Sequence, residues 1–181
     1  AMVGHYKAVA KAVSLPILMY NIPARTGNSI SRETVAELAQ VENIIGIKDS
    51  SGNFDNTLQY LEATDRKFAV IAGNDSLILS TLMAGGVGAI AGTGNIFPER
   101  LVEMYNAWES GDIAKATALQ DSIRPIRDCL KLGNPNSVIK RAANLIGYPV
   151  GPARAPFDGD YTAWDPVLMK TLREHYPELL K

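Results

Sequence analysis

Cysteine and histidine are scarce in this sequence of 181 residues, which has one cysteine, Cys129, and two histidines, His5 and His175. A single cysteine excludes an internal disulfide framework and a multi-cysteine zinc site, and it is typical of a reducing compartment. The two histidines lie far apart in the chain and make no ligand spacing. We therefore expect no metal site and no cofactor.

An excess of positive charge is also absent. Eighteen Lys and Arg residues against nineteen Asp and Glu residues leave a formal net charge of -1. A basic surface of the kind that binds nucleic acid or acidic membranes is therefore not expected. The sequence also lacks an apolar run of the roughly 18 residues that a membrane span needs, and it does not open on a signal peptide. We expect a cytoplasmic protein without a nucleic-acid or membrane partner.

What the sequence does contain is a regular alternation of short apolar runs with helical patterns. Hydrophobic residues make up 46% of the chain, enough for a sizeable core. Each apolar run is too short for a helix and is followed by a polar or glycine-rich turn, which predicts a buried strand. The expected strands are Ile17–Tyr20, Ile44–Lys48, Phe68–Ala72 and Ala89–Ala91.

Helical periodicity occupies the segments before, between and after these runs. One expected helix begins at a cap formed by Ser29 or Ser31, and another is interrupted at Pro125. The expected helices are Val3–Val13, the capped segment through Leu38, Phe54–Ala63, Leu77–Ala84, Pro98–Trp108, Asp112–Lys131, Ser137–Leu145 and Pro166–His175.

This order of elements predicts an α/β fold with parallel strands covered by helices. Four βα units are half of an eight-stranded (β/α)8 TIM barrel. We expect residues 1–97 to form this half barrel, and residues 98–181 to form a carboxyl-terminal helical region of the same domain. The strands form an open sheet, or another copy or chain supplies the missing half, or the chain is a fragment. Because open strand edges tend to pair, we expect a homo-oligomer.

Functional residues of parallel βα arrays gather at the carboxyl ends of the strands, where Lys48 follows the run Ile44–Ile47. In a strand buried on both faces, the Lys48 ammonium would be drawn into an interior. Burial lowers the pKa of an amine toward neutrality, and a neutral amine can attack a carbonyl carbon to form a Schiff base. The alternative is that Lys48 only pairs with Asp49 or another carboxylate. Tyr20 likewise has a simple alternative, an aromatic side chain packed against a helix.

Two segments of the sequence, taken together, are a more specific signal of function than Lys48 or Tyr20 alone. They are Tyr20–Gly27, with the sequence YNIPARTG, and Gly46–Gly52, with the sequence GIKDSSG. This pair resembles the signature of the dihydrodipicolinate synthase and N-acetylneuraminate lyase superfamily, and the resemblance extends over nearly the whole chain. It implies that the four strands correspond to the fifth to eighth strands of that family's barrel, and that the first four are missing here.

The resemblance implies a pyruvate-dependent class I aldolase. Lys48 matches the lysine that condenses with the pyruvate ketone to form an imine, whose enamine then attacks an aldehyde. Tyr20 matches the tyrosine that moves protons during these steps. Arg25 matches the arginine that holds the carboxylate of the aldehyde in the synthase branch, where its planar guanidinium suits that anion. Gly73 and Ile90 match positions whose backbone lines the pyruvate pocket.

Three functions stay open. Arg25 and Thr26 favour the synthase branch, in which pyruvate condenses with aspartate semialdehyde on the route to lysine. The segment Asp49-Ser50-Ser51 also occurs in aldolases of 2-keto-3-deoxy sugar acids from the same superfamily. The third possibility is an inactive fragment that folds and self-associates, because the family's loop for the pyruvate carboxylate and the partners of its tyrosine belong to the missing half.

Overall fold

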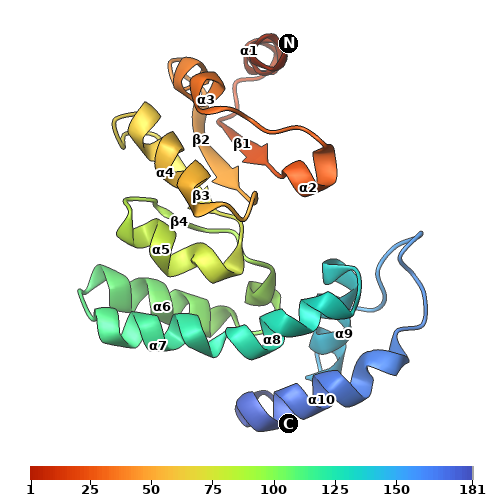
Figure 1. The fold of residues 1–181 in the computed structure, drawn as a ribbon. Coiled ribbons are helices and arrows are strands. Elements are labelled where there is room, and N and C mark those ends of the chain that lie inside the picture. The colour runs from red at the N-terminus through yellow and green to blue at the C-terminus, as the bar shows by residue number, and fades with distance from the viewer. Residues whose placement is uncertain (181) are drawn as a thin grey trace. The chain divides into compact units, whose positions relative to one another are not determined.

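A computed structural model describes residues 1–180, and its central feature is a four-stranded parallel sheet in the order β1-β2-β3-β4 (Figure 1). This arrangement confirms the predicted α/β fold. The strands are β1 (Ile17–Asn21), β2 (Ile44–Asp49), β3 (Ala69–Ala72) and β4 (Gly88–Ala89). The last strand is shorter than predicted, since Ile90 and Ala91 lie beyond it. The amide of Ile90 nevertheless donates a hydrogen bond to the carbonyl oxygen of Ala72, at 2.9 Å.

The helices that accompany the sheet begin close to where the sequence predicts them. Ser31, and not Ser29, caps α3, because its side chain accepts a hydrogen bond from the amide of Thr34. The sequence analysis missed α2, a single turn that ends at Gly27 in the left-handed conformation. These helices are α1 (Met2–Ala12), α2 (Pro23–Thr26), α3 (Arg32–Leu38), α4 (Phe54–Ala63) and α5 (Ile78–Met83), and a 3-10 turn, η1 (Asp75–Leu77), precedes α5.

One face of the sheet carries the core, with α3 and α4 packed along it (Figure 1). Met19, Ile47 and Val70 project from successive strands onto this face and are completely buried. The side chains that alternate with them are more accessible: Tyr20 is 45% exposed and Lys48 is half-buried. The expectation that the Lys48 strand is buried on both faces is therefore wrong. Helices cover one face of the sheet, so only alternate residues of each strand enter the core.

The chain divides into two compact units, Ala1–Ala91 and Gly92–Lys181. In the second unit, the predicted helix Asp112–Lys131 is broken into three parts near Pro125, which occupies the first turn of the middle part. The elements of this unit are η2 (Gly92–Asn95), α6 (Pro98–Glu109), α7 (Ile113–Ser122), α8 (Arg124–Asp128), η3 (Cys129–Leu132), α9 (Pro135–Leu145), η4 (Thr162–Trp164), α10 (Asp165–His175) and η5 (Pro177–Leu179).

A buried tyrosine ties the helices of the second unit together. The phenol of Tyr176 donates a hydrogen bond to the carbonyl oxygen of Ser122, at 2.7 Å, and accepts one from the amide of Ile126, at 3.2 Å. Leu168 and Leu172 of α10 are completely buried as well. Within residues 1–180, no helix combines the length and apolar character that crossing a membrane requires.

Candidate active site

Tyr20 and Lys48 lie side by side near the carboxyl ends of β1 and β2. They are partners in the strand register, and the Lys48 Nζ stands 4.3 Å from the centroid of the Tyr20 ring. This distance is typical of an amine placed over an aromatic face. The pairing follows from the parallel register of the two strands, which brings residues distant in sequence to the same level of the sheet.

The Lys48 amine has no carboxylate partner within residues 1–180. The alternative in which Lys48 pairs with Asp49 is therefore wrong. Successive side chains of a strand point to opposite faces, so the Asp49 carboxylate turns toward α4 while the Lys48 amine stays on the open face. The structure leaves the amine half-buried beside a phenol.

Asp49 is the centre of a buried polar network beneath this pair. The carboxylate is 5% exposed, and it accepts five hydrogen bonds of 2.9–3.2 Å. The donors are the side-chain amides of Asn21 and Asn56, the hydroxyls of Ser51 and Thr57, and the backbone amide of Ser51. Such a set of donors satisfies a buried carboxylate without a cation. The sequence analysis assigned Asp49 no such role.

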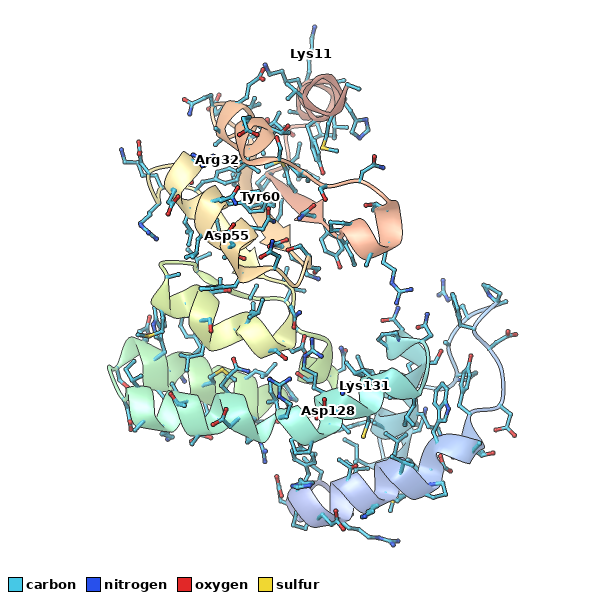
Figure 2. The ribbon with its side chains drawn as sticks, viewed as in Figure 1. Lys11, Arg32, Asp55, Tyr60, Asp128 and Lys131 are labelled. Atoms are coloured by element: carbon cyan, nitrogen blue, oxygen red, sulfur yellow. The ribbon has the colours of Figure 1, made fainter. Side chains whose placement is uncertain are left out.

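Asn21 and Tyr60 extend the network to the segment before α3. The Asn21 side chain is 1% exposed, donates to Asp49 and accepts from the amide of Ile30, at 3.0 Å. The phenol of Tyr60, labelled on α4 in Figure 2, donates to the carbonyl oxygen of Ile30. Burial raises the pKa of this phenol to about 12. The network thus holds the ends of β1 and β2 against α4, at the level of the Tyr20 and Lys48 pair.

Gly73 lies directly beside the lysine. Its amide donates to the carbonyl oxygen of Asp49, at 2.8 Å. A Cβ atom at this position would lie 2.0 Å from the Ser50 Oγ and 2.8 Å from the Lys48 Cε, closer than real Cβ contacts come. Glycine is therefore required for the close approach of the turn after β3 to the lysine side chain.

Ser50 adds a hydroxyl that the sequence analysis did not single out as functional. Its Oγ donates to the Tyr20 phenol across a long distance of 3.5 Å, and its amide donates to the carbonyl oxygen of Asn21, at 2.8 Å. The structure therefore gathers an amine, a phenol and an aliphatic hydroxyl at the ends of β1 and β2. The signal in the sequence was the polar segment that directly follows Lys48.

Two other predicted site residues stand apart from this group. Arg25 is exposed on α2, and its guanidinium forms no ion pair among residues 1–180. Ile90 is 48% exposed just beyond β4. Neither residue makes a hydrogen bond to Lys48, Tyr20 or Gly73 in the described part of the chain. The same residues contain no group of three His, Cys, Asp or Glu side chains able to hold a metal ion.

Comparison with known proteins now identifies the family. The family model described as the dihydrodipicolinate synthetase family matches residues 1–174. The chain belongs to this family. The resemblance inferred from the Tyr20–Gly27 and Gly46–Gly52 segments is thereby confirmed, and so is the class of enzyme to which the chain is related, the lyases of the dihydrodipicolinate synthetase family.

Two curated relatives within the family are synthases from archaea. The chain is 42% identical to the 4-hydroxy-tetrahydrodipicolinate synthase of Methanococcoides burtonii, over 86% of this chain and 54% of the relative. It is 37% identical to the synthase of the same name from Methanopyrus kandleri, over 98% of this chain and 55% of the relative. The chain spans about half the length of the curated relatives it matches.

Solved structures of the family share the fold. The dihydrodipicolinate synthase of Thermotoga maritima is 30% identical with a TM-score of 0.91, over 98% of this chain and 61% of that one. YagE, a prophage protein of the family from E. coli K12 solved in complex with pyruvate, is 32% identical with a TM-score of 0.84, over 95% and 60% of the two chains. These matches extend the likeness from sequence to the arrangement of elements.

Proposed function

We propose that this chain carries the Schiff-base centre of a pyruvate-dependent class I aldolase. The observation that supports this proposal is the position of the Lys48 Nζ, 4.3 Å from the Tyr20 ring and without a carboxylate partner among residues 1–180. A lysine amine is the nucleophile that forms imines with ketones, and a phenol near it can serve as the general acid and base. Relatives in the family use the same Schiff-base chemistry.

The proposed reaction begins with attack of the neutral Lys48 amine on the ketone carbon of pyruvate. The resulting carbinolamine loses its hydroxyl as water, which leaves the imine. Loss of a proton from the pyruvate methyl group gives an enamine, and the enamine carbon forms the new bond to the aldehyde carbon. Water then hydrolyses the imine and regenerates the amine. Tyr20 moves protons in these steps, and the Ser50 hydroxyl donates a long hydrogen bond of 3.5 Å to its phenol.

The remaining site residues take binding roles in this proposal. Gly73 leaves room for pyruvate beside Lys48, because any side chain there would collide with the lysine. The backbone amide of Ile90 already donates to the carbonyl oxygen of Ala72. We therefore assign the carbonyl oxygen of Ile90 to the pyruvate pocket. Arg25 holds the carboxylate of the aldehyde, a role that suits an exposed guanidinium without an ion-pair partner in the described chain.

Aspartate semialdehyde is the aldehyde that this proposal favours, and the product would enter lysine biosynthesis. The curated synthases of 37–43% identity support this choice. A sugar-acid aldolase is the second candidate, and the Ser50 hydroxyl beside Tyr20, within the segment Asp49-Ser50-Ser51, favours it. The two candidates are distinguished by measuring the turnover of pyruvate with aspartate semialdehyde and with glyceraldehyde, in the parent chain and in Arg25→Ala. Loss of turnover with aspartate semialdehyde alone supports the synthase.

We further propose that residues 1–97 are the second half of a (β/α)8 barrel, with residues 98–181 as the helical region of the same domain. The match to about 60% of each solved chain supports this assignment. So does the open face of the sheet, where Tyr20 and Ile90 are nearly half exposed. In a closed barrel that face is interior. A second half, from a preceding segment or from another copy, would cover it.

Borohydride trapping tests the Schiff base. The protein is incubated with pyruvate and reduced, and the adduct is located by mass spectrometry of peptides. We expect the reduced adduct, a secondary amine, on Lys48 alone, and we expect no adduct in Lys48→Arg. Lys67→Arg is the matched control, because Lys67 is an exposed lysine that follows α4, away from Lys48 in the β2–α4 unit. This variant should still form the adduct on Lys48. A folded chain that gives no adduct would overturn the proposal and favour the inactive fragment.

A further inference from the structure

A cavity of about 540 Å³ lies within the second unit, and none of the residues proposed for the Schiff-base centre lines it. This volume falls in the range of small-molecule sites, roughly 300–1,000 Å³. Most of the wall is apolar, with Ile139 and Ala143 of α9 on one side and Phe157 of the following loop on another. Ile139 and Ala143 are buried, whereas Phe157 is 46% exposed.

Two cationic side chains face this cavity, and no carboxylate lines it. The Lys140 Nζ donates to the carbonyl oxygen of Val150, at 3.1 Å, and it forms no ion pair within residues 1–180. The Arg154 guanidinium forms no ion pair or hydrogen bond among residues 1–180. Asp165, which does not line the cavity, forms an ion pair with Arg141. The residues that line the cavity therefore include two cationic side chains and no acidic one.

The first turn of α9 contributes uncharged polar groups to the same wall. Asn134 caps the helix by accepting from the amide of Asn136, at 3.0 Å, and both residues line the cavity. The amide of Val138 donates to the Asn134 carbonyl oxygen, at 3.0 Å, and Pro135 has no amide hydrogen. The positive charge of the cavity therefore comes from its two cationic side chains.

We propose that this cavity binds a small organic carboxylate with an apolar body. The carboxylate would lie against Arg154 and Lys140, where the guanidinium can donate two parallel hydrogen bonds. The apolar body of the ligand would cover Ile139, Ala143 and Phe157. An inorganic anion would leave these side chains exposed to water, so it would bind less favourably. All residues that line the cavity belong to the second unit, and none of them is proposed for the Schiff-base centre.

Fluorine NMR with 4-fluorobenzoate as the probe tests this site. The probe carries a carboxylate on an apolar ring, and it has no ketone that could react with a lysine. We expect saturable binding to the full chain, and binding of the neutral 4-fluorobenzamide at least fivefold weaker. Arg154→Gln should weaken 4-fluorobenzoate about fivefold, the upper range for a charge pair at an exposed side chain. Because Arg154 is exposed, this variant should fold like the parent.

Matched controls separate the cavity from general charge. Arg173→Gln removes an exposed arginine of α10 outside the cavity and should leave binding unchanged. Ala153→Leu, in the loop that lines the cavity, should weaken both probes by filling space. Equal binding of the benzoate and the benzamide would overturn the proposal. Equal effects of Arg154→Gln and Arg173→Gln would overturn it too, as would displacement by inorganic phosphate as effective as that by benzoate.

The Schiff-base proposal and this one fail separately. Lys48→Arg abolishes trapping if the first proposal holds, but it should leave 4-fluorobenzoate binding unchanged. Loss of probe binding in Lys48→Arg, with the chain still folded, would show that the probe occupies the lysine site and would overturn the second site. Retained binding supports a cavity with its own ligand.

Discussion

Asn21 and Asp49 join the ends of β1 and β2 through a buried hydrogen bond of 2.9 Å between the Asn21 Nδ2 and the Asp49 Oδ1. The two residues are register partners, and the preceding pair in the register is Tyr20 and Lys48. The polar contact on the helix side of the sheet therefore sets the level of the amine and the phenol on the open side. This relationship makes Asp49 a positioning residue for the proposed centre.

Asp49→Asn should destabilise the chain and slow trapping at Lys48. In the variant, an NH2 group replaces one carboxylate oxygen and would point at hydrogen-bond donors. The hydrogen bonds lost there were made to a charged acceptor, and such bonds contribute about 1.5–3 kcal/mol each. We expect a fall of about 3 kcal/mol in the free energy of unfolding, measured by urea denaturation. Asp55→Asn is the control, since Asp55 is an exposed aspartate of α4 that accepts a hydrogen bond from Gln59 (Figure 2). Equal losses in both variants would contradict the role of the network.

Gly73→Ala should lower both stability and trapping. The new Cβ would lie 2.0 Å from the Ser50 Oγ and 2.8 Å from the carbonyl oxygen of Asp49, so the turn must move away from Lys48. Overpacking of this kind costs about 1–3 kcal/mol. Gly88→Ala is the matched control, because nothing lies within 4 Å of its Cβ position. Denaturation and the rate of adduct formation, measured on both variants, should separate them clearly.

Tyr20→Phe should slow imine formation without unfolding the chain. The side chain is 45% exposed, so loss of the hydroxyl removes little packing. Loss of a general acid and base lowers a rate by about a hundredfold or more. The time course of adduct formation with pyruvate gives the rate, and Tyr148→Phe, at another exposed tyrosine, is the control. An unchanged rate in Tyr20→Phe would remove the phenol from the mechanism.

Tyr60 should make the chain less stable in alkali. Burial raises the pKa of its phenol to about 12, above the value of about 10 in the unfolded chain. The unfolded state therefore releases its proton first, and the stability present below pH 10 is lost as the pH rises toward 12. Tyr60→Phe should flatten this part of the stability profile, measured by urea denaturation at several pH values. A profile of unchanged slope would argue against a buried phenol.

The chain on its own should self-associate. Tyr20 and Ile90 leave apolar surface on the open side of the sheet, and β1 and β4 are its two edges. We expect a mass that rises with concentration in sedimentation, and weaker association in Ile90→Lys. Val102→Lys, at an exposed apolar residue of α6, should leave association unchanged. A monomer at high concentration would contradict this prediction.

Much of the fold could be predicted because its signals are local. A short apolar run followed by a polar turn indicates a strand wherever the strand later pairs, and this placed Tyr20 and Lys48 at strand ends. The break at Pro125 was equally local, since proline lacks the amide that a helix interior needs. The single turn of α2 was missed, because four residues are too few to show a helical period.

The sequence by itself determined the order of the elements, because periodicity is a property of neighbouring residues. The family and the candidate residues followed from the resemblance of the Tyr20–Gly27 and Gly46–Gly52 segments. The tertiary structure alone decided that Asp49 accepts from five donors, while the Lys48 amine lies on the open face with no carboxylate partner among residues 1–180. It also decided that Arg154 and Lys140 share one cavity. The exposure and partners of a side chain depend on which distant element packs over it, and no local pattern records that packing.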